Sequence, residues 1–371
     1  MRFSCTKENI AKALMLVSGV AGKNINLPIL NNVLIKADQQ KVEVVATNLE
    51  MATVVNIRAI TEMPGSFTVP AKTLADFVNL LGEEKISFEL KENELVVECG
   101  KSSTKIKGTP AEDFPIIPAV DEGIGYVATA TELKRGLSHV IPATAKNDIR
   151  PELSGVYMGF NVEPKKLIMA ATDSYRLAEK KISLVQGDEE KKIIVPGRTA
   201  LEISRILSLE DNLENEKNAR VLVGEGQIAL HYGNVQMVSR LIEGQYPDYR
   251  QIIPKEFKAS IEIETDKLIK EIKAASLFST SGVNAVHLTI KPSEGLEIVS
   301  TSTQTGDYRS ELEGEVSGET VGVLLNHRYL LDGLNNIESD KVKLKVINAD
   351  SPCELTPKED GYLYIVMPIR Q

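Results

Sequence analysis

The chain has 371 residues, a formal net charge of −9 and 42% hydrophobic residues, a composition typical of a globular protein. No apolar run approaches the length that crosses a bilayer and the first residues resemble no signal peptide, so we expect neither feature. Three widely spaced cysteines argue against a disulfide framework and favour a reducing cytoplasm. The absence of tryptophan and the low aromatic content argue against a stacking platform for single-stranded nucleic acid.

The chain opens with a predicted amphipathic helix over 6–18. Ile10, Ala13, Leu14 and Val17 recur there at helical spacing and form one apolar face. Short runs of β-favouring residues follow, which predict strands rather than further helices. The strand-like runs of this part of the chain are 41–45, 52–57, 86–90 and 94–98.

A second helix is predicted over 71–81, where Leu74 and Val78 share one face. The polar pair Glu92-Asn93 separates the last two strand-like runs and indicates a hairpin turn. Neighbouring strands with few helices between them are typical of antiparallel sheets. We therefore expect an α+β fold with helices on one face and antiparallel sheets outside.

The same markers return twice at a spacing of about 125 residues. Three strand ends are alike: Val45-Ala46-Thr47-Asn48, Ala170-Ala171-Thr172-Asp173 and Val299-Ser300-Thr301-Ser302. Helices are predicted in the later copies at 131–146, 197–208, 265–277 and 326–336. Repeats of about 124 residues are long enough for each copy to bury its own core. We expect three tandem domains, at 1–122, 126–253 and 255–371.

Charge is distributed unevenly over these predicted elements. The six helices hold twelve Lys and Arg against seven Asp and Glu, although the whole chain is acidic. A general preference of helices for basic residues is the alternative explanation, but glutamate is equally favourable in helices. A basic helical surface beside an acidic remainder favours a partner with negative charge.

A search for catalytic motifs finds little. His139, His231, His287 and His327 have no partner at metal-ligand spacing, so we expect no metal and no cofactor. Gly224-Glu225-Gly226 opens no helix and indicates a hairpin turn rather than a dinucleotide loop. Asp173 with Arg176 is interpreted as a turn cap and a structural ion pair.

Six short segments, in order along the whole chain, form a specific combination. They are Leu27-Pro28-Ile29-Leu30, Thr47-Asn48-Leu49-Glu50-Met51, Pro110-Ala111-Glu112-Asp113-Phe114-Pro115, Ala171-Thr172-Asp173-Ser174-Tyr175-Arg176-Leu177-Ala178, Tyr246-Pro247-Asp248-Tyr249-Arg250 and Val366-Met367-Pro368-Ile369-Arg370. Together they resemble the bacterial sliding clamp family, the β subunits of DNA polymerase III. The resemblance implies three tandem DNA-clamp domains per chain and two chains closed head to tail into a dimeric ring around duplex DNA.

The size of one predicted domain supports such a dimer independently of the family resemblance. A domain of about 124 residues is roughly 35 Å across. Three touching spheres of that size leave a hole of about 5 Å, and six leave about 35 Å. The grooves of a duplex alone are about 8 Å deep, so a single chain is too small to surround DNA.

The resemblance implies two further sets of residues. The positions expected near the duplex are Lys23, Asn24, Lys146, Asn147, Arg198 and Arg205. The family often has a basic residue where Asn24 stands, so Lys23 is expected to replace that contact; a solvated surface charge is the alternative for each basic residue. At the dimer interface, Leu277 and Phe278 are expected to meet Ile106 of an edge strand, and packing within one domain is the alternative.

A groove between the second and third domains is implied to bind short linear motifs of polymerase, clamp loader and repair proteins. Its expected residues are Leu153, Thr172, Tyr175, Arg176, Leu177, Pro247, Gln251, Ile252, Ser351, Ile365, Met367, Pro368, Ile369 and Arg370. Met and Pro beside branched side chains suit a surface that accepts several related peptides. Tyr175 stands where some members have His, and Gln251 where some have a second Arg, so peptide preference is expected to differ. Each apolar residue alone also fits a core position.

The leading interpretation is a non-enzymatic processivity factor, a cytoplasmic homodimer that tethers replication and repair proteins to DNA. The alternative is a DNA- or nucleotide-processing enzyme whose catalytic residues are unrecognised. A third interpretation, a sequence-specific regulator that does not encircle DNA, would require a recognition helix.

Overall fold

The computed structural model describes residues 1–22, 26–82, 85–117, 123–147, 149–209, 218–280, 282–357 and 361–370. Contacts divide the chain into two compact units. The first unit comprises Met1–Lys134, Val185–Gly187 and Glu202–Leu241, and the second Arg135–Leu184, Asp188–Leu201 and Ile242–Gln371. The middle part of the chain contributes to both units.

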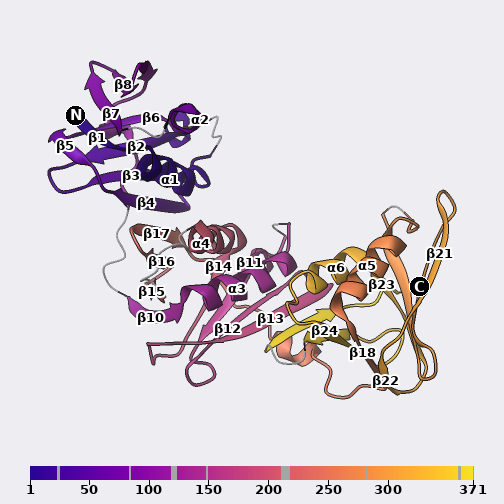
Figure 1. Cartoon of the computed structure of the whole chain (residues 1–371). Helices are drawn as coiled ribbons and strands as arrows, with labels where there is room; N and C mark the ends of the chain where they lie inside the picture. Colours follow the sequence, from indigo (N-terminus) through magenta and orange to yellow (C-terminus); the bar gives the residue numbers. More distant parts are fainter. Residues whose placement is uncertain are drawn as a thin grey trace. The chain divides into compact units, whose positions relative to one another are not determined.

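The first unit contains two antiparallel sheets (Figure 1). The five-stranded sheet has the order β5 (Ile60–Met63), β1 (Arg2–Thr6), β7 (Lys85–Lys91), β8 (Glu94–Cys99), β9 (Ser102–Lys107). The eight-stranded sheet has the order β10 (Ile124–Thr129), β15 (Asn218–Val223), β16 (Gln227–Tyr232), β17 (Val235–Arg240), β4 (Met51–Ile57), β3 (Val42–Thr47), β2 (Asn32–Ala37), β6 (Gly65–Pro70).

The second unit also contains two antiparallel sheets. The nine-stranded sheet has the order β14 (Lys191–Pro196), β11 (Gly155–Phe160), β12 (Lys166–Thr172), β13 (Arg176–Ser183), β26 (Tyr362–Val366), β25 (Cys353–Pro357), β24 (Lys341–Val346), β18 (Ala259–Glu264), β22 (Glu315–Gly318). The four-stranded sheet has the order β21 (Gly306–Leu312), β20 (Gly295–Ser302), β19 (Ala285–Lys291), β23 (Val321–Asn326).

One strand order occurs three times. The segments β1-β7-β8-β9, β10-β15-β16-β17 and β18-β24-β25-β26 correspond, as do β6-β2-β3-β4, β14-β11-β12-β13 and β23-β19-β20-β21. Neighbouring copies are joined edge to edge, through β4 with β17 and through β13 with β26. The predicted threefold α+β repeat with antiparallel sheets is confirmed.

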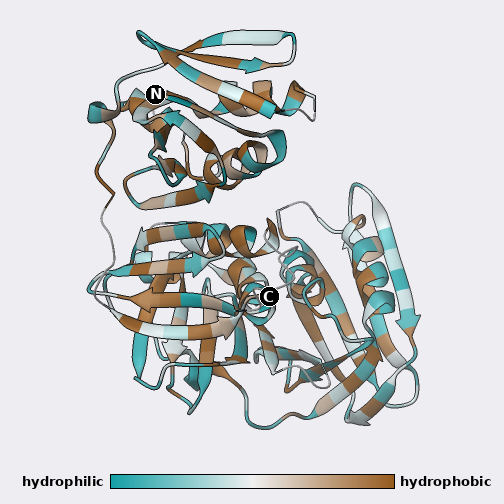
Figure 2. Ribbon diagram, turned by 60° about the vertical axis from the view of Figure 1, so that its left-hand side comes forward, coloured by the Kyte–Doolittle hydropathy of each residue, from teal (hydrophilic) through white to brown (hydrophobic). Residues whose placement is uncertain are grey.

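Among the described residues each copy carries two α-helices, at the positions where the sequence predicts them. They are α1 (Lys7–Ser18), α2 (Ala71–Leu80), α3 (Ala130–Val140), α4 (Gly197–Leu209), α5 (Thr265–Ser276) and α6 (His327–Leu334). Helix α1 packs on α2 and on strands β3 and β4, and α5 packs on α6 and on β20 and β21 (Figure 1). Ribbons coloured by hydropathy show hydrophobic and hydrophilic residues alternating along single helices and strands, as one-sided burial requires (Figure 2).

The third predicted helix is too long. Helix α3 ends at Val140 and is followed by the short 3-10 helix η3 (Ile141–Ala143), which contains Pro142. Proline cannot continue an α-helix because it lacks the backbone donor and clashes with the preceding turn. Lys146 therefore lies in a loop and not on a helix.

The predicted hairpin turns are confirmed. Lys91 pairs with Glu94 around the turn, and Glu92 takes a left-handed conformation with φ of 55°. Val223 pairs with Ile228 around the second turn, where Gly226 has a φ of 70°.

The repeated strand ends form the same tight turn in the first two copies. In the first, the Thr47 hydroxyl donates to the Met51 carbonyl at 2.9 Å and accepts from the Leu49 backbone N–H at 3.1 Å. The Asn48 side-chain oxygen accepts from the backbone N–H groups of Glu50 and Met51, at 3.0 and 2.8 Å. These polar side chains satisfy backbone groups that the turn leaves without strand partners.

In the second copy, the Thr172 hydroxyl donates to the Arg176 carbonyl at 2.6 Å and accepts from the Ser174 N–H at 3.1 Å. The Asp173 carboxylate accepts from the backbone N–H groups of Tyr175 and Arg176, at 3.0 and 3.1 Å. Leu49 and Ser174, at equivalent positions, both have positive φ, at 74° and 76°. The sequence marker is thus a structural requirement of the turn in these two copies. In the third copy the Gln304 N–H donates to the Ser302 hydroxyl at 3.2 Å, so the turn lies one residue beyond the marker threonine Thr301.

Replacing Thr172 by Val should destabilise the protein by about 1–3 kcal/mol, because valine keeps the shape but removes one donor and one acceptor from a buried site. A fall of several degrees in Tm, followed by circular dichroism, would show this. Thr301→Val at an exposed strand position is the matched control, with a change below about 0.5 kcal/mol. Equal effects of the two substitutions would contradict the assigned role of the turn.

Candidate functional site

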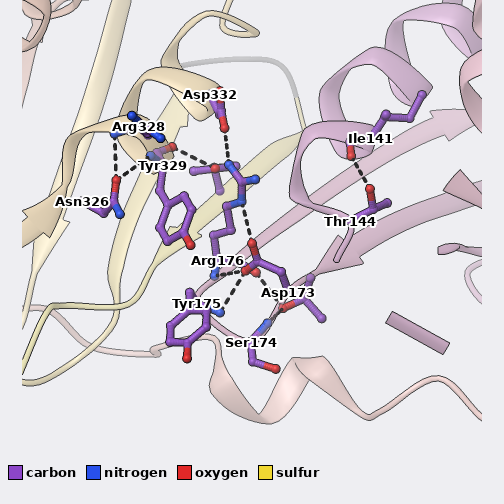
Figure 3. A network of polar contacts seen from close by, with 12 residues as sticks. Ile141, Thr144, Asp173, Ser174, Tyr175, Arg176, Asn326, Arg328, Tyr329 and Asp332 are labelled. Carbon is purple, nitrogen blue, oxygen red and sulfur yellow. Dashed lines mark hydrogen bonds and ion pairs between the residues drawn. The ribbon is translucent and has the colours of Figure 1, made fainter. Parts of the chain in front are cut away.

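The turn after β12 presents Tyr175 to solvent while it buries its neighbour Arg176. The Tyr175 side chain is 63% exposed, whereas the side chain of Arg176 is only 4% exposed. The Arg176 Nε donates to the Asp173 carboxylate at 3.1 Å, and Nη1 donates to the Asp332 carboxylate of α6. Its guanidinium also lies over the Tyr329 ring, 4.5 Å from the centroid (Figure 3).

These contacts give the buried cation two carboxylates and an aromatic face, which offset the cost of removing it from water. The network connects the turn of the second copy to helix α6 of the third (Figure 3). The interpretation of Asp173 and Arg176 as a turn cap and an ion pair is therefore supported, and Asp332 and Tyr329 are added to it. Tyr364 donates its hydroxyl to the Tyr329 carbonyl at 2.9 Å, which fixes the backbone that carries this ring.

The C-terminal segment lies beside the same turn. Strand β26 pairs with β13, so that Ile365 lies opposite Leu177. Beyond the strand, the Met367 N–H donates to the Tyr175 carbonyl and the Ile369 N–H donates to the Leu324 carbonyl, both at 2.8 Å. Tyr364 to Val366 are fully buried, as expected of a final core strand, whereas Met367, Pro368 and Ile369 are half-buried.

A hydrophobic cluster lies beneath this surface. Its buried members are Ala170, Leu177, Tyr249 and Ile365. The Thr172 N–H donates to the Tyr246 hydroxyl oxygen at 3.0 Å, and burial raises the pKa of Tyr246 and of Tyr249. Both phenols are therefore neutral hydrogen-bonding groups at physiological pH.

The sequence prediction of site residues omits three aromatic residues of this cluster and its surroundings. Tyr246 and Tyr249 lie within a quoted motif, and Tyr157 packs against the same cluster. The signal that would have identified Tyr246 is the repeat itself, since Phe114-Pro115 in the motif of the first copy corresponds to Tyr246-Pro247.

The remaining predicted groove residues are spread over several loops. Leu153 is buried in the 3-10 helix η4 (Pro151–Ser154), and Ile252 is 42% exposed in η5 (Tyr249–Ile252). Gln251 donates its side-chain amide to Asp248 at 2.9 Å. Pro247 and Ser351 are half-buried, and Arg370 is exposed.

The predicted DNA-facing residues have different environments. Lys146, Asn147 and Arg198 are exposed, Arg198 in the first turn of α4. Lys23 and Asn24 lie outside the described residues.

Arg205 is engaged within the protein. Its Nη1 and Nη2 donate to the carbonyls of Met15 and Leu16, at 2.7 and 2.6 Å, and its Nε donates to Glu202 at 2.8 Å. Helix α1 has no basic residue of its own in its last turn, and Arg205 supplies a cation to the carbonyls there. A Cβ on Gly19 would lie 2.5 Å from the Arg205 Nη2, so a side chain at this position would displace the guanidinium from the α1 carbonyls.

Of the predicted interface residues, Ile106 lies on a sheet edge, and Leu277 and Phe278 follow helix α5. Strand β9 is an edge strand, as expected, but Ile106 is only 5% exposed and packs largely within its own domain. Leu277 is 70% exposed at the end of α5. Phe278 is half-buried and stacks on Tyr308 of β21, with ring centroids 5.8 Å apart.

No cluster of three or more His, Cys, Asp or Glu suited to a metal ion occurs within the described ranges. The buried His139 bonds through Nδ1 with the Arg135 carbonyl at 2.6 Å, and His327 Nε2 bonds with the Ser279 hydroxyl at 3.0 Å. Of the helices that the structure describes, none is long and apolar enough to cross a membrane.

Family models for the DNA polymerase III beta subunit match the chain three times. The N-terminal, central and C-terminal domain models match residues 1–118, 128–248 and 250–370. Among curated proteins, the beta sliding clamp of Haemophilus influenzae is 29% identical and that of Bacillus subtilis 26% identical, each aligned over the whole of both chains.

Solved structures of the family have the same fold. The DNA polymerase III subunit beta of Pseudomonas aeruginosa is 26% identical, with a TM-score of 0.92 over the whole of both chains. The DNA polymerase sliding clamp of Bacillus subtilis is 26% identical, with a TM-score of 0.93 over 100% of this chain and 99% of that one. With all three domain models matched in order along its length, the chain belongs to the DNA polymerase III beta subunit family.

Proposed function

We propose that the protein is a DNA sliding clamp, a non-enzymatic processivity subunit that encircles duplex DNA and tethers the replicative polymerase and repair proteins. The observation that carries this function is the threefold domain repeat, each copy of which matches one domain model of the family. We propose domain boundaries at 1–122, 126–253 and 255–371, close to the limits of those models.

The edges of the sheets support closure into a ring. Strands β9 and β21 are sheet edges without a strand neighbour on one side among the described residues. By the repeat, β9 corresponds to β17 and β26, and β21 corresponds to β4 and β13, which are the strands that join successive copies. Pairing of β9 with β21 of a second chain would repeat the same junction and close a head-to-tail dimer.

Leu277 and Phe278 adjoin the free β21 edge. The exposure of Leu277 and the stacking of Phe278 on Tyr308 support an apolar contact with the region of Ile106 in the second chain. Three free, buried cysteines support the proposed location in the reducing cytoplasm, and burial raises the pKa of Cys5 and Cys353 to about 12.

Leu277→Asp should convert the dimer into folded monomers, because a carboxylate in an apolar contact loses its hydration without gaining a partner. We expect the dimer Kd to rise at least about 100-fold, equivalent to about 2.7 kcal/mol. Sedimentation equilibrium measures the mass, and circular dichroism verifies the fold. Ile149→Asp, at a side chain that is 86% exposed elsewhere, is the matched control. A variant that stays dimeric would reject this interface, and one that fails to fold would indicate intradomain packing.

A closed ring leaves DNA only where the DNA ends. Loaded on a nicked circular duplex, the protein should remain bound through gel filtration and be released after the circle is cut once. Exposed cations such as Lys146 and Arg198 would supply attraction to phosphates without sequence preference. Cutting a circle whose ends are blocked by bound protein is the control, and retention should then persist. Equal retention on free-ended and circular DNA would argue against encirclement.

The surface formed by Tyr175, Met367, Pro368 and Ile369 is proposed as the docking site for partner peptides. Tyr175 is well exposed, and the other three side chains are partly exposed above a buried hydrophobic cluster. The backbone bonds of Met367 and Ile369 hold the C-terminal segment in place against the turn and against β23. A fixed apolar surface limits the entropy lost when a peptide binds.

Met367→Ala should weaken binding of a peptide that contains Gln followed by Leu and Phe by at least about 1 kcal/mol, a roughly fivefold rise in Kd. A double variant with Ile369→Ala should bind still more weakly. Isothermal titration calorimetry measures both. Met63→Ala, at a methionine that is 59% exposed on β5, is the control. Undiminished affinity in the folded double variant would eliminate this site.

A further inference from the structure

The junction between β4 and β17 reproduces the junction that carries the proposed peptide surface. Ala52 pairs with Val238 at the first junction. Leu177 pairs with Ile365 at the second, at the equivalent place in the repeat. The two junctions therefore share one register.

The equivalence extends to the residues just beyond the paired strands. The Arg240 N–H donates to the Glu50 carbonyl at 3.0 Å, just as the Met367 N–H donates to the Tyr175 carbonyl at 2.8 Å. Arg240 and Glu50 thus hold the backbone positions that Met367 and Tyr175 hold at the second junction.

Equivalent hydrophobic clusters lie on the same face of both junctions. At the first junction Leu34, Val45 and Phe114 are buried together, and Ala111 and Ile117 pack against them. At the second junction Tyr157, Ala170, Tyr246 and Tyr249 correspond to Leu34, Val45, Phe114 and Ile117, since Phe114-Pro115 matches Tyr246-Pro247.

The first junction is hollow. A cavity of about 470 Å³ and one of about 250 Å³ share Ala52, Val238 and the segment 115–117, so they form one continuous groove. Leu34 and Ile117 stand where the second junction has the rings of Tyr157 and Tyr249, and these smaller side chains leave the space open. We call this hollow, lined by Leu34, Val45, Ala52, Phe114, Ile116 and Val238, the β4–β17 groove.

The rim of the β4–β17 groove is apolar and exposed. Ile116 is 95% exposed and Leu49 is 48% exposed. Exposed branched side chains beside an open apolar hollow are typical of a binding surface.

Charge in the lining is balanced. Lys36 and Arg240 are matched by Glu50 and Glu112. The further acid, Glu43, forms an ion pair with Lys41 at 2.5 Å. A balanced lining complements a segment without net charge, and it offers no excess of cations for the phosphates of a nucleic acid.

We propose that the β4–β17 groove is a second peptide-docking site, which takes an uncharged, extended segment with one or two branched or aromatic side chains. Its floor has Phe114 and Ile117 in place of Tyr246 and Tyr249; at the second junction the Tyr246 hydroxyl accepts from the Thr172 N–H and the Tyr249 hydroxyl donates to Glu179. The β4–β17 groove therefore favours apolar side chains, because it lacks the two phenol groups that form hydrogen bonds at the second junction. One chain can hold two different segments, which raises the effective concentration of a partner that carries both.

The test uses the full chain with Met367→Ala and Ile369→Ala, so that the surface proposed above does not contribute. The probe is a peptide of Gln, Leu, Ser, Leu and Phe with acetylated and amidated ends. Methyl NMR of isoleucine should show saturable shifts at Ile116 and Ile117. Ile116→Asp, at a fully accessible position that folding does not need, should weaken binding at least tenfold. Ala111→Tyr should do the same by filling the hollow, and Ile149→Asp should not.

Absence of shifts at millimolar peptide would overturn the proposal, as would shifts that survive both groove variants. Shifts produced by short duplex DNA in place of the peptide would assign the β4–β17 groove to another ligand and also overturn it. A concentration-dependent mass increase abolished by Ile116→Asp would make the occupant a second copy, again against the proposal. Failure here leaves the circular-DNA experiment unaffected, so the two proposals are judged separately.

Discussion

Antiparallel pairing between edge strands of successive copies is the constraint on which the rest of the structure depends. An unpaired edge exposes a row of backbone donors and acceptors, and the β4–β17 and β13–β26 pairs satisfy these groups inside the chain. The same pairing merges sheets of neighbouring copies into continuous sheets of eight and nine strands. Two equivalent edges, on β9 and β21, are left for a second chain, and closure of a ring is the expected use of them.

The turns that precede β4 and β13 determine which side chains are exposed at the two junctions between copies. Both turns use a threonine and an Asn or Asp side chain to bind the backbone, so their geometry is alike. They differ in the residue that enters the strand: Met51 in one and Arg176 in the other. Arg176 must be neutralised because it is buried, and Asp173, Asp332 and Tyr329 surround it. One backbone framework thus carries two chemically distinct surfaces.

Arg205 shows how tertiary contacts reassign a charge. The sequence predicts a position facing DNA for Arg205, yet its nitrogens donate to the Met15 and Leu16 carbonyls of α1 and to the Glu202 carboxylate. Gly19 leaves room for the Arg205 guanidinium, and a Cβ there would displace the ends of the Arg205 and Glu202 side chains. The structure therefore gives Arg205 a capping role, and its contact with DNA stays a prediction.

Sequence alone determined the repeat, the helix positions and the turns, because apolar periodicity and turn-forming side chains are local signals that recur in each copy. The α+β class and the antiparallel sheets followed from the same patterns. The end of α3 was missed, although Pro142 marks it. Only the tertiary structure decided which strand edges meet. It also decided that Leu177 and Ile365 are buried in one hydrophobic cluster beside Met367, and that Tyr246 and Tyr249 belong to this cluster. Those contacts join residues from 70 to 188 positions apart, and no local pattern encodes burial at such separations.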